Sequence, residues 1–163
     1  MITPNNIVDA KLGGASKEEI QAMQQQLGKE VKSKAIVVSR EMDYDSFEDM
    51  IVTALEGGSN YWYLLDLNNS IGFIKKYADD QRPMTIRIAD ALYNNEDSSV
   101  VVLDTEDEEE TLGTLTYQSV RKTLENFPKD HQWALDNVLN GDYDANDADV
   151  VFQVLVMGEV VYG

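Results

Sequence analysis

The residues best suited to binding chemistry lie in one short segment, from Glu56 to Trp62. Its glycine pair lets the backbone approach a partner closely, and the amide and aromatic groups that follow suit a planar ligand. We therefore expect a ligand site here, with an aromatic residue near the end of the sequence as a second anchor. The expected ligand-binding residues are Glu56, Gly57, Gly58, Asn60, Tyr61, Trp62 and Tyr162. A helix cap followed by a core strand is the more ordinary interpretation of the same segment, and both interpretations stay open.

A second candidate surface is an acidic run. It consists of Asp104, Glu106, Asp107, Glu108, Glu109 and Glu110. With 30 acidic and 13 basic residues, the chain has a formal charge of −17, which repels nucleic acid and attracts basic protein surfaces. The run is typical of a solvated loop, and it also fits a mimic of DNA in which carboxylates replace phosphates. We expect no direct binding to nucleic acid.

The motifs of the common enzyme classes are missing from the sequence. Cysteine is absent, His131 is the single histidine, and no nucleophile elbow or glycine-rich phosphate loop occurs. A pair of catalytic carboxylates cannot be located among thirty acidic residues. We therefore expect a protein that is not an enzyme, with no catalytic residue and no cofactor.

One segment begins like a calcium loop. Asp142, Asp144 and Asn146 supply oxygen atoms at the first, third and fifth positions. The pattern then fails, because Asp147 stands where the sharp turn requires glycine and Gln153 where the bidentate glutamate belongs. Helix capping accounts for the same residues, so we expect no metal site.

The first 34 residues predict an arm that precedes the main domain. Ser16 and Glu19 have the spacing of a capping box, which predicts a helix from about 17 to 32. The apolar residues that recur at helical spacing in it are Ile20, Met23, Leu27 and Val31. They form a narrow stripe, typical of a helix that lies on a surface or pairs with a second copy.

Residues 35–163 predict a single α+β domain. We expect strands over 35–39, 60–66, 99–104 and 111–116, and helices over 47–55, 70–79, 84–93, 117–126 and 131–139. The glycine pair should end the first of these helices in a left-handed cap. A last helix, capped by Asp144 or Asn146 and ending at Gly158, should be buried on most of its circumference. The expected architecture is a small, mostly antiparallel sheet of about four strands covered by helices, with a helical C-terminal half.

Nothing in the sequence demands a membrane. The longest apolar stretch, residues 150–157, is far short of the roughly 20 residues that span a bilayer. The first residues lack the charged and apolar regions of a signal peptide, and cysteine is absent. We therefore expect an intracellular protein.

Two segments resemble a family of small proteins encoded by bacteriophages and prophages: residues 53–62, TALEGGSNYW, and residues 147–163, DADVVFQVLVMGEVVYG. The resemblance covers roughly residues 35–163 and excludes the arm. It implies an accessory phage protein in the cytoplasm of the infected bacterial host, a class that often counters host defences. The family carries no established catalytic residues, so the resemblance transfers none.

The function expected from these observations is binding without catalysis. The first hypothesis is a protein that sequesters a small nucleotide-like immune signal at the Tyr61–Trp62 junction, either within one protomer or between the protomers of a homo-oligomer. The alternative is an acidic mimic of DNA that blocks a basic host protein such as a CRISPR effector or a nuclease. A phage structural or assembly component, forming stable homo-oligomers, is a further alternative.

Overall fold

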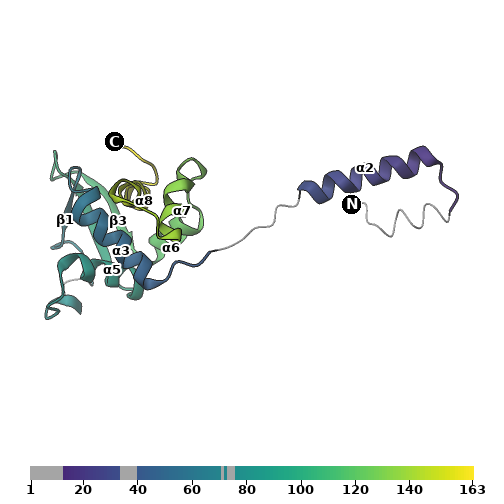
Figure 1. Ribbon diagram of the computed structural model, residues 1–163. Coiled ribbons are helices and arrows are strands. Elements are labelled where there is room, and N and C mark those ends of the chain that lie inside the picture. Colours follow the sequence, from purple (N-terminus) through teal and green to yellow (C-terminus); the bar gives the residue numbers. More distant parts are fainter. Residues whose placement is uncertain (1–12, 34–39, 71, 73–75) are drawn as a thin grey trace. The chain divides into compact units, whose positions relative to one another are not determined.

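The computed structural model describes residues 13–33, 40–70, 72 and 76–163. The chain divides into two compact units, residues 1–39 and residues 40–163 (Figure 1). In the first unit, helix α2 spans Lys17–Ser33. The amide of Glu19 donates to Ser16 Oγ at 3.2 Å, and the amide of Ser16 donates to Glu19 Oε2 at 2.8 Å. The predicted capping box and helix are therefore confirmed.

The second unit, which we call the body, contains an antiparallel sheet. Its strands β1 (Tyr63–Asp66), β2 (Ser99–Asp104) and β3 (Thr111–Thr116) lie in the order β1-β2-β3. The α+β class and the β2–β3 hairpin are as predicted. The described residues contain three strands, and the expected strand at 35–39 lies outside them. Strand β1 begins at Tyr63, three residues later than predicted, because residues 60–62 form a turn.

Helices cover one side of this sheet (Figure 1). In chain order they are α3 (Tyr44–Thr53), the π-helix η1 (Ala54–Gly58), α5 (Met84–Asn94), α6 (Tyr117–Glu125), the short 3₁₀-helix η2 (Lys129–His131), α7 (Gln132–Asn140) and α8 (Ala145–Met157). The expected helix at 70–79 lies partly outside the described residues.

Helix α8 is the centre of the body. Asp144 caps it, as one of the two expected caps, and its residues from Asp147 to Val156 are all buried. It packs against η1, α7 and β3. Gly158, with a φ of 82°, ends the helix in the left-handed region, which glycine adopts without steric cost. The predicted burial around the circumference of this helix is confirmed.

The predicted left-handed cap at the glycine pair is wrong. Neither Gly57 nor Gly58 has a positive φ, and the helix widens into the π-turn η1 instead of ending. The reason for Gly58 is close packing: a Cβ atom there would lie 2.4 Å from the carbonyl oxygen of Ala145 and 3.3 Å from the Cβ of Asp149. A Cβ on Gly57 would meet nothing within 4 Å. Only one glycine of the pair is therefore required by packing.

This difference predicts opposite effects of two matched substitutions. Gly58→Ala should lower the free energy of unfolding by about 1–3 kcal/mol, because overpacking pushes η1 away from α8. Gly57→Ala should raise it by about 0.5–1 kcal/mol, because alanine restricts the unfolded chain without a clash. Urea unfolding of both variants measures the difference, and equal effects would contradict the packing argument.

Candidate functional site

Residues 56–62, which we call the junction, contact helix α8 through one buried carboxylate, that of Asp149. Trp62 donates from Nε1 to Asp149 Oδ1 at 2.7 Å, and Tyr61 donates from its hydroxyl to Oδ2 at 3.0 Å. Gln153 donates from Nε2 to the same Oδ2 at 2.9 Å. A buried carboxylate is stable only when donors surround it, and here three side chains supply them. We call Asp149, Gln153, Tyr61 and Trp62 the Asp149 cluster.

Within the Asp149 cluster, Trp62 is a residue of the hydrophobic core. The indole is only 1% exposed, and it packs against Phe152 with ring centroids 5.5 Å apart. Tyr61 differs, because its ring is 52% exposed although its hydroxyl is bound. Burial and the bond to Asp149 raise the pKa of Tyr61 above its usual value. The junction therefore presents one exposed aromatic ring, that of Tyr61.

Gln153 fixes the segment that follows α8. Its Oε1 accepts from the amides of Val161 and Tyr162 at 2.9 and 2.8 Å, and its Nε2 donates to the carbonyl of Tyr162 at 2.8 Å. These bonds hold an irregular segment, which we call the tail (residues 159–163), without incorporating it in the sheet. A fully buried amide side chain thus pairs with backbone that would otherwise lack partners.

Tyr162 links the tail to both candidate surfaces. Its ring stacks on Trp62 with centroids 5.4 Å apart and planes 7° apart, and its hydroxyl donates to Asp104 Oδ2 at 2.6 Å. This bond, together with partial burial and the nearby acidic charges, raises the pKa of Tyr162 to about 12. The same bond is the main cause of a lowered pKa for Asp104.

The acidic run forms the turn between β2 and β3, which we call the acidic turn (residues 104–110). The amide of Glu106 donates to Asp104 Oδ1 at 2.6 Å, and the amide of Glu109 donates to Asp107 Oδ1 at 3.1 Å. Thr105 ties the turn to the junction by donating from its amide to the carbonyl of Trp62 at 3.2 Å. The side chains of residues 106–110 are all exposed.

The charges of the acidic turn are uncompensated. Among the described residues, the ion pairs within 4.0 Å are those of Arg82 with Asp80 and Asp90. The body as a whole carries 26 acidic against 8 basic residues. The acidic turn therefore presents its negative charge to solvent.

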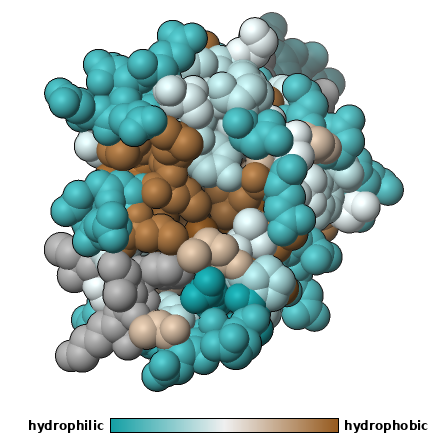
Figure 2. All heavy atoms as spheres, turned by 90° about the vertical axis from the view of Figure 1, so that its left-hand side faces the viewer, coloured by the Kyte–Doolittle hydropathy of each residue, from teal (hydrophilic) through white to brown (hydrophobic). Residues whose placement is uncertain are grey.

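Apolar side chains lie beside the acidic turn on the sheet. The register pairs Leu64 with Leu103 on one face, and alternation places Val101 on that face as well. Leu64 is 38% exposed, and the other two are partly exposed. Figure 2, which views the body from the side of β1, shows hydrophobic side chains gathered in the middle of this side and hydrophilic ones around them. We call Leu64, Val101 and Leu103 the apolar face.

The predicted site residues fall into two groups. Tyr61, Trp62 and Tyr162 come together with Asp104 of the acidic run. Glu56 lies apart, accepting from Thr85 Oγ1 of α5 at 2.9 Å, and Asn60 is exposed. Sequence reasoning missed Asp149 and Gln153, whose signal is their spacing of four in the otherwise apolar stretch of residues 148–157.

No protein-family model, curated protein or solved structure matches the chain. The resemblance to phage proteins therefore stays a prediction. Within the described ranges, no set of three or more histidine and acidic side chains is arranged to hold a metal ion. In the part of the chain that the structure describes, no helix is both long and apolar enough to cross a bilayer.

The Asp149 cluster predicts a large cost for removing its carboxylate. Asp149→Ala should lower the free energy of unfolding by about 2–4 kcal/mol, because the donors of Trp62, Tyr61 and Gln153 lose their shared acceptor. Asp136→Ala, which removes an exposed carboxylate from α7, is the matched control and should change it by less than about 0.5 kcal/mol. Urea unfolding measures both, and similar small effects would contradict the role of Asp149.

The bond between Tyr162 and Asp104 predicts a pH-dependent contribution to stability. The folded-state pKa of Asp104 lies below the usual value of an aspartate, so the stabilisation is present above that usual value and is lost as the pH falls through the lowered pKa. Tyr162→Phe should therefore destabilise the body at neutral pH, and the difference from wild type should shrink in acid.

Two measurements test this prediction: unfolding curves at several pH values, and an NMR titration of the Asp104 carboxyl group. In the Tyr162→Phe variant, the pKa of Asp104 should rise toward its usual value. An unchanged Asp104 pKa in the variant would contradict the assigned cause.

Proposed function

We propose that the body is a non-enzymatic binding module that docks on a basic surface of a protein partner. The acidic turn and the apolar face form the docking surface. The observation that carries the proposal is that the acidic turn directly follows β2, the strand that carries Val101 and Leu103, and that the side chains of residues 106–110 are all exposed. Apolar contacts supply most of the affinity of such an interface, whereas charges steer the encounter and select the partner.

Charge selects between the possible occupants of this surface. A second copy of the chain would bring two acidic turns together, which costs free energy because like charges repel. A partner with lysine and arginine around an apolar centre would instead neutralise the carboxylates of the acidic turn. The surface therefore favours a basic protein over a homotypic contact.

The resemblance to phage proteins suggests which basic proteins are candidates. Grooves that bind DNA or RNA are lined with lysine and arginine, and exposed carboxylates can occupy them in place of phosphates. A host nuclease or CRISPR effector has such a groove. We propose counter-defence by occupation of a nucleic-acid groove as the biological role.

The other two hypotheses have less support from the geometry. A nucleotide stacked at the Tyr61–Trp62 junction has no free indole face, because Tyr162 and Phe152 lie against Trp62. Sequestration of a nucleotide-like signal there stays a prediction, as does assembly into a structural homo-oligomer. Native mass spectrometry of protein from an infected host distinguishes these two hypotheses. A released small molecule would support sequestration, and an oligomer without ligand would support structural assembly.

The docking surface predicts the effect of neutralising the acidic turn. Glu106, Asp107, Glu108, Glu109 and Glu110 are changed to their amides, and affinity for a basic protein captured from host lysate is measured at low and high salt. Affinity should fall at least roughly tenfold at low salt, and wild-type affinity should fall steeply with added salt. Leu64→Ser should weaken binding without changing the salt dependence.

The control removes the same charge elsewhere. It carries amides at Asp45, Asp49, Glu96, Asp130 and Asp142, five exposed carboxylates outside the docking surface. This variant should keep most of the affinity. Equal losses in both variants would mean that net charge, and not the acidic turn, governs binding, and salt-independent binding would overturn the proposal.

A further inference from the structure

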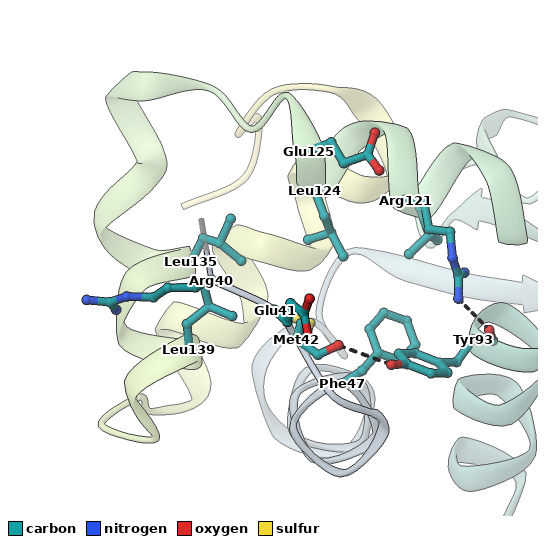
Figure 3. A pocket seen from close by; sticks show the side chains of 11 residues that line it. Arg40, Glu41, Met42, Phe47, Tyr93, Arg121, Leu124, Glu125, Leu135 and Leu139 are labelled. Atoms are coloured by element: carbon teal, nitrogen blue, oxygen red, sulfur yellow. Dashed lines mark hydrogen bonds between the residues drawn. The ribbon is translucent and has the colours of Figure 1, made fainter. Parts of the chain in front are cut away.

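A cavity of about 380 Å³ opens between α3, α6 and α7 (Figure 3). None of the residues that line it belongs to the docking surface. The volume of the cavity falls within the range of small-molecule sites. The apolar side chains that line it are Met42, Phe47, Val120, Leu124, Leu135 and Leu139. Such a lining offers water few hydrogen-bond partners, so an apolar group gains free energy by replacing the water.

Arg121 of α6 places a positive charge at one end of the cavity. Its Nη2 donates to the carbonyl of Tyr93 at 2.8 Å, and its Nη1 donates to the carbonyl of Tyr117 at 3.3 Å. The guanidinium group also lies over the Tyr117 ring, 3.5 Å from the centroid. These contacts fix the group in place and use two of its five N–H donors. The other three can meet an anion.

The wall beside Arg121 is also fixed. The hydroxyl of Tyr93 donates to the carbonyl of Met42 at 3.1 Å, joining α5 to the segment before α3. Figure 3 shows Arg121 directed toward Tyr93, whereas Arg40 points away at the opposite end. Arg40 donates to Asn140 Oδ1 at 2.7 Å. Arg121 is therefore the cation that can face a ligand at the Tyr93 end.

The charges around the cavity favour an anion at this end. Glu41 and Glu125 also line the cavity, but both are exposed, whereas Arg121 is partly buried. Water screens an exposed charge more than a partly buried one, so the field of Arg121 dominates inside. Among the described residues, no carboxylate lies within 4.0 Å of its guanidinium group.

We propose that this cavity binds an amphiphilic anion, with an aliphatic chain along the leucine side chains and a carboxylate on Arg121. The carboxylate accepts from guanidinium N–H groups that the backbone carbonyls leave available, which gives a charge-assisted hydrogen bond. The aliphatic chain fills the volume between α6 and α7. This site is independent of the docking surface.

Calorimetric titration of the full chain with octanoate tests the proposal. Octanoate should bind with one-to-one stoichiometry, octan-1-ol should bind at least about tenfold more weakly, and octyltrimethylammonium should not bind measurably. Arg121→Gln should weaken octanoate binding at least about tenfold. Lys122→Gln, which removes an exposed positive charge from the next position of α6, should leave the affinity unchanged.

A second variant keeps the test decisive if Arg121→Gln fails to fold. Leu124→Glu keeps Arg121 and places a carboxylate one helical turn from it, where the new charge repels an anion and competes for the guanidinium N–H groups. It should abolish octanoate binding while the circular dichroism spectrum stays that of wild type. Absence of octanoate binding to wild type, equal affinity for the three head groups, or retained affinity in Leu124→Glu would each overturn the proposal.

Discussion

The body depends on the burial of one acidic side chain, that of Asp149. An isolated charge at this position in α8 would cost several kilocalories per mole, so the surrounding chain must supply donors. Trp62, Tyr61 and Gln153 do so from two segments that are far apart in the sequence. Gln153 then holds the tail, and the tail places Tyr162 on Trp62. The orientation of the junction relative to α8 therefore follows from a single electrostatic requirement.

The same contacts shape the acidic turn. Repulsion between neighbouring carboxylates favours an open loop, yet backbone amides donate to Asp104 and Asp107 and hold the turn closed. Tyr162 adds a donor to Asp104 from the tail side. Because these bonds already order the turn in the free protein, binding of a partner would cost less conformational entropy than binding by a mobile loop. A basic partner of the kind proposed would therefore meet the carboxylates of Asp104 and Asp107 in positions that backbone amides already restrict.

The sequence predicted secondary-structure elements more accurately than it predicted tertiary contacts between side chains. Apolar periodicity located α2 and α5, a nearly continuous apolar run located α8, which is buried on most of its circumference, and β-branched runs located β2 and β3. The left-handed cap at the glycine pair failed because the need for glycine at position 58 comes from Ala145 and Asp149, which lie about 90 residues away. No local pattern contains that contact. The roles of Asp149 and Gln153 were missed for the same reason, since a polar residue on a helix reveals its partner only in the folded chain.

The contrast between Trp62 and the cavity beside Arg121 shows how prior organisation limits where a small molecule can bind. A ligand stacked on Trp62 would have to displace Tyr162, which also breaks the bond to Asp104 and disturbs the contacts of Gln153 with the tail. Binding there would carry the cost of that rearrangement. The cavity beside Arg121 already has its volume and its fixed cation, so a ligand replaces only water. In the aromatic pair that looks suited to stacking in the sequence, Trp62 is thus a core residue and Tyr61 is exposed. At the cavity, two backbone carbonyls hold Arg121 in place, which is the arrangement that the proposed anion site requires.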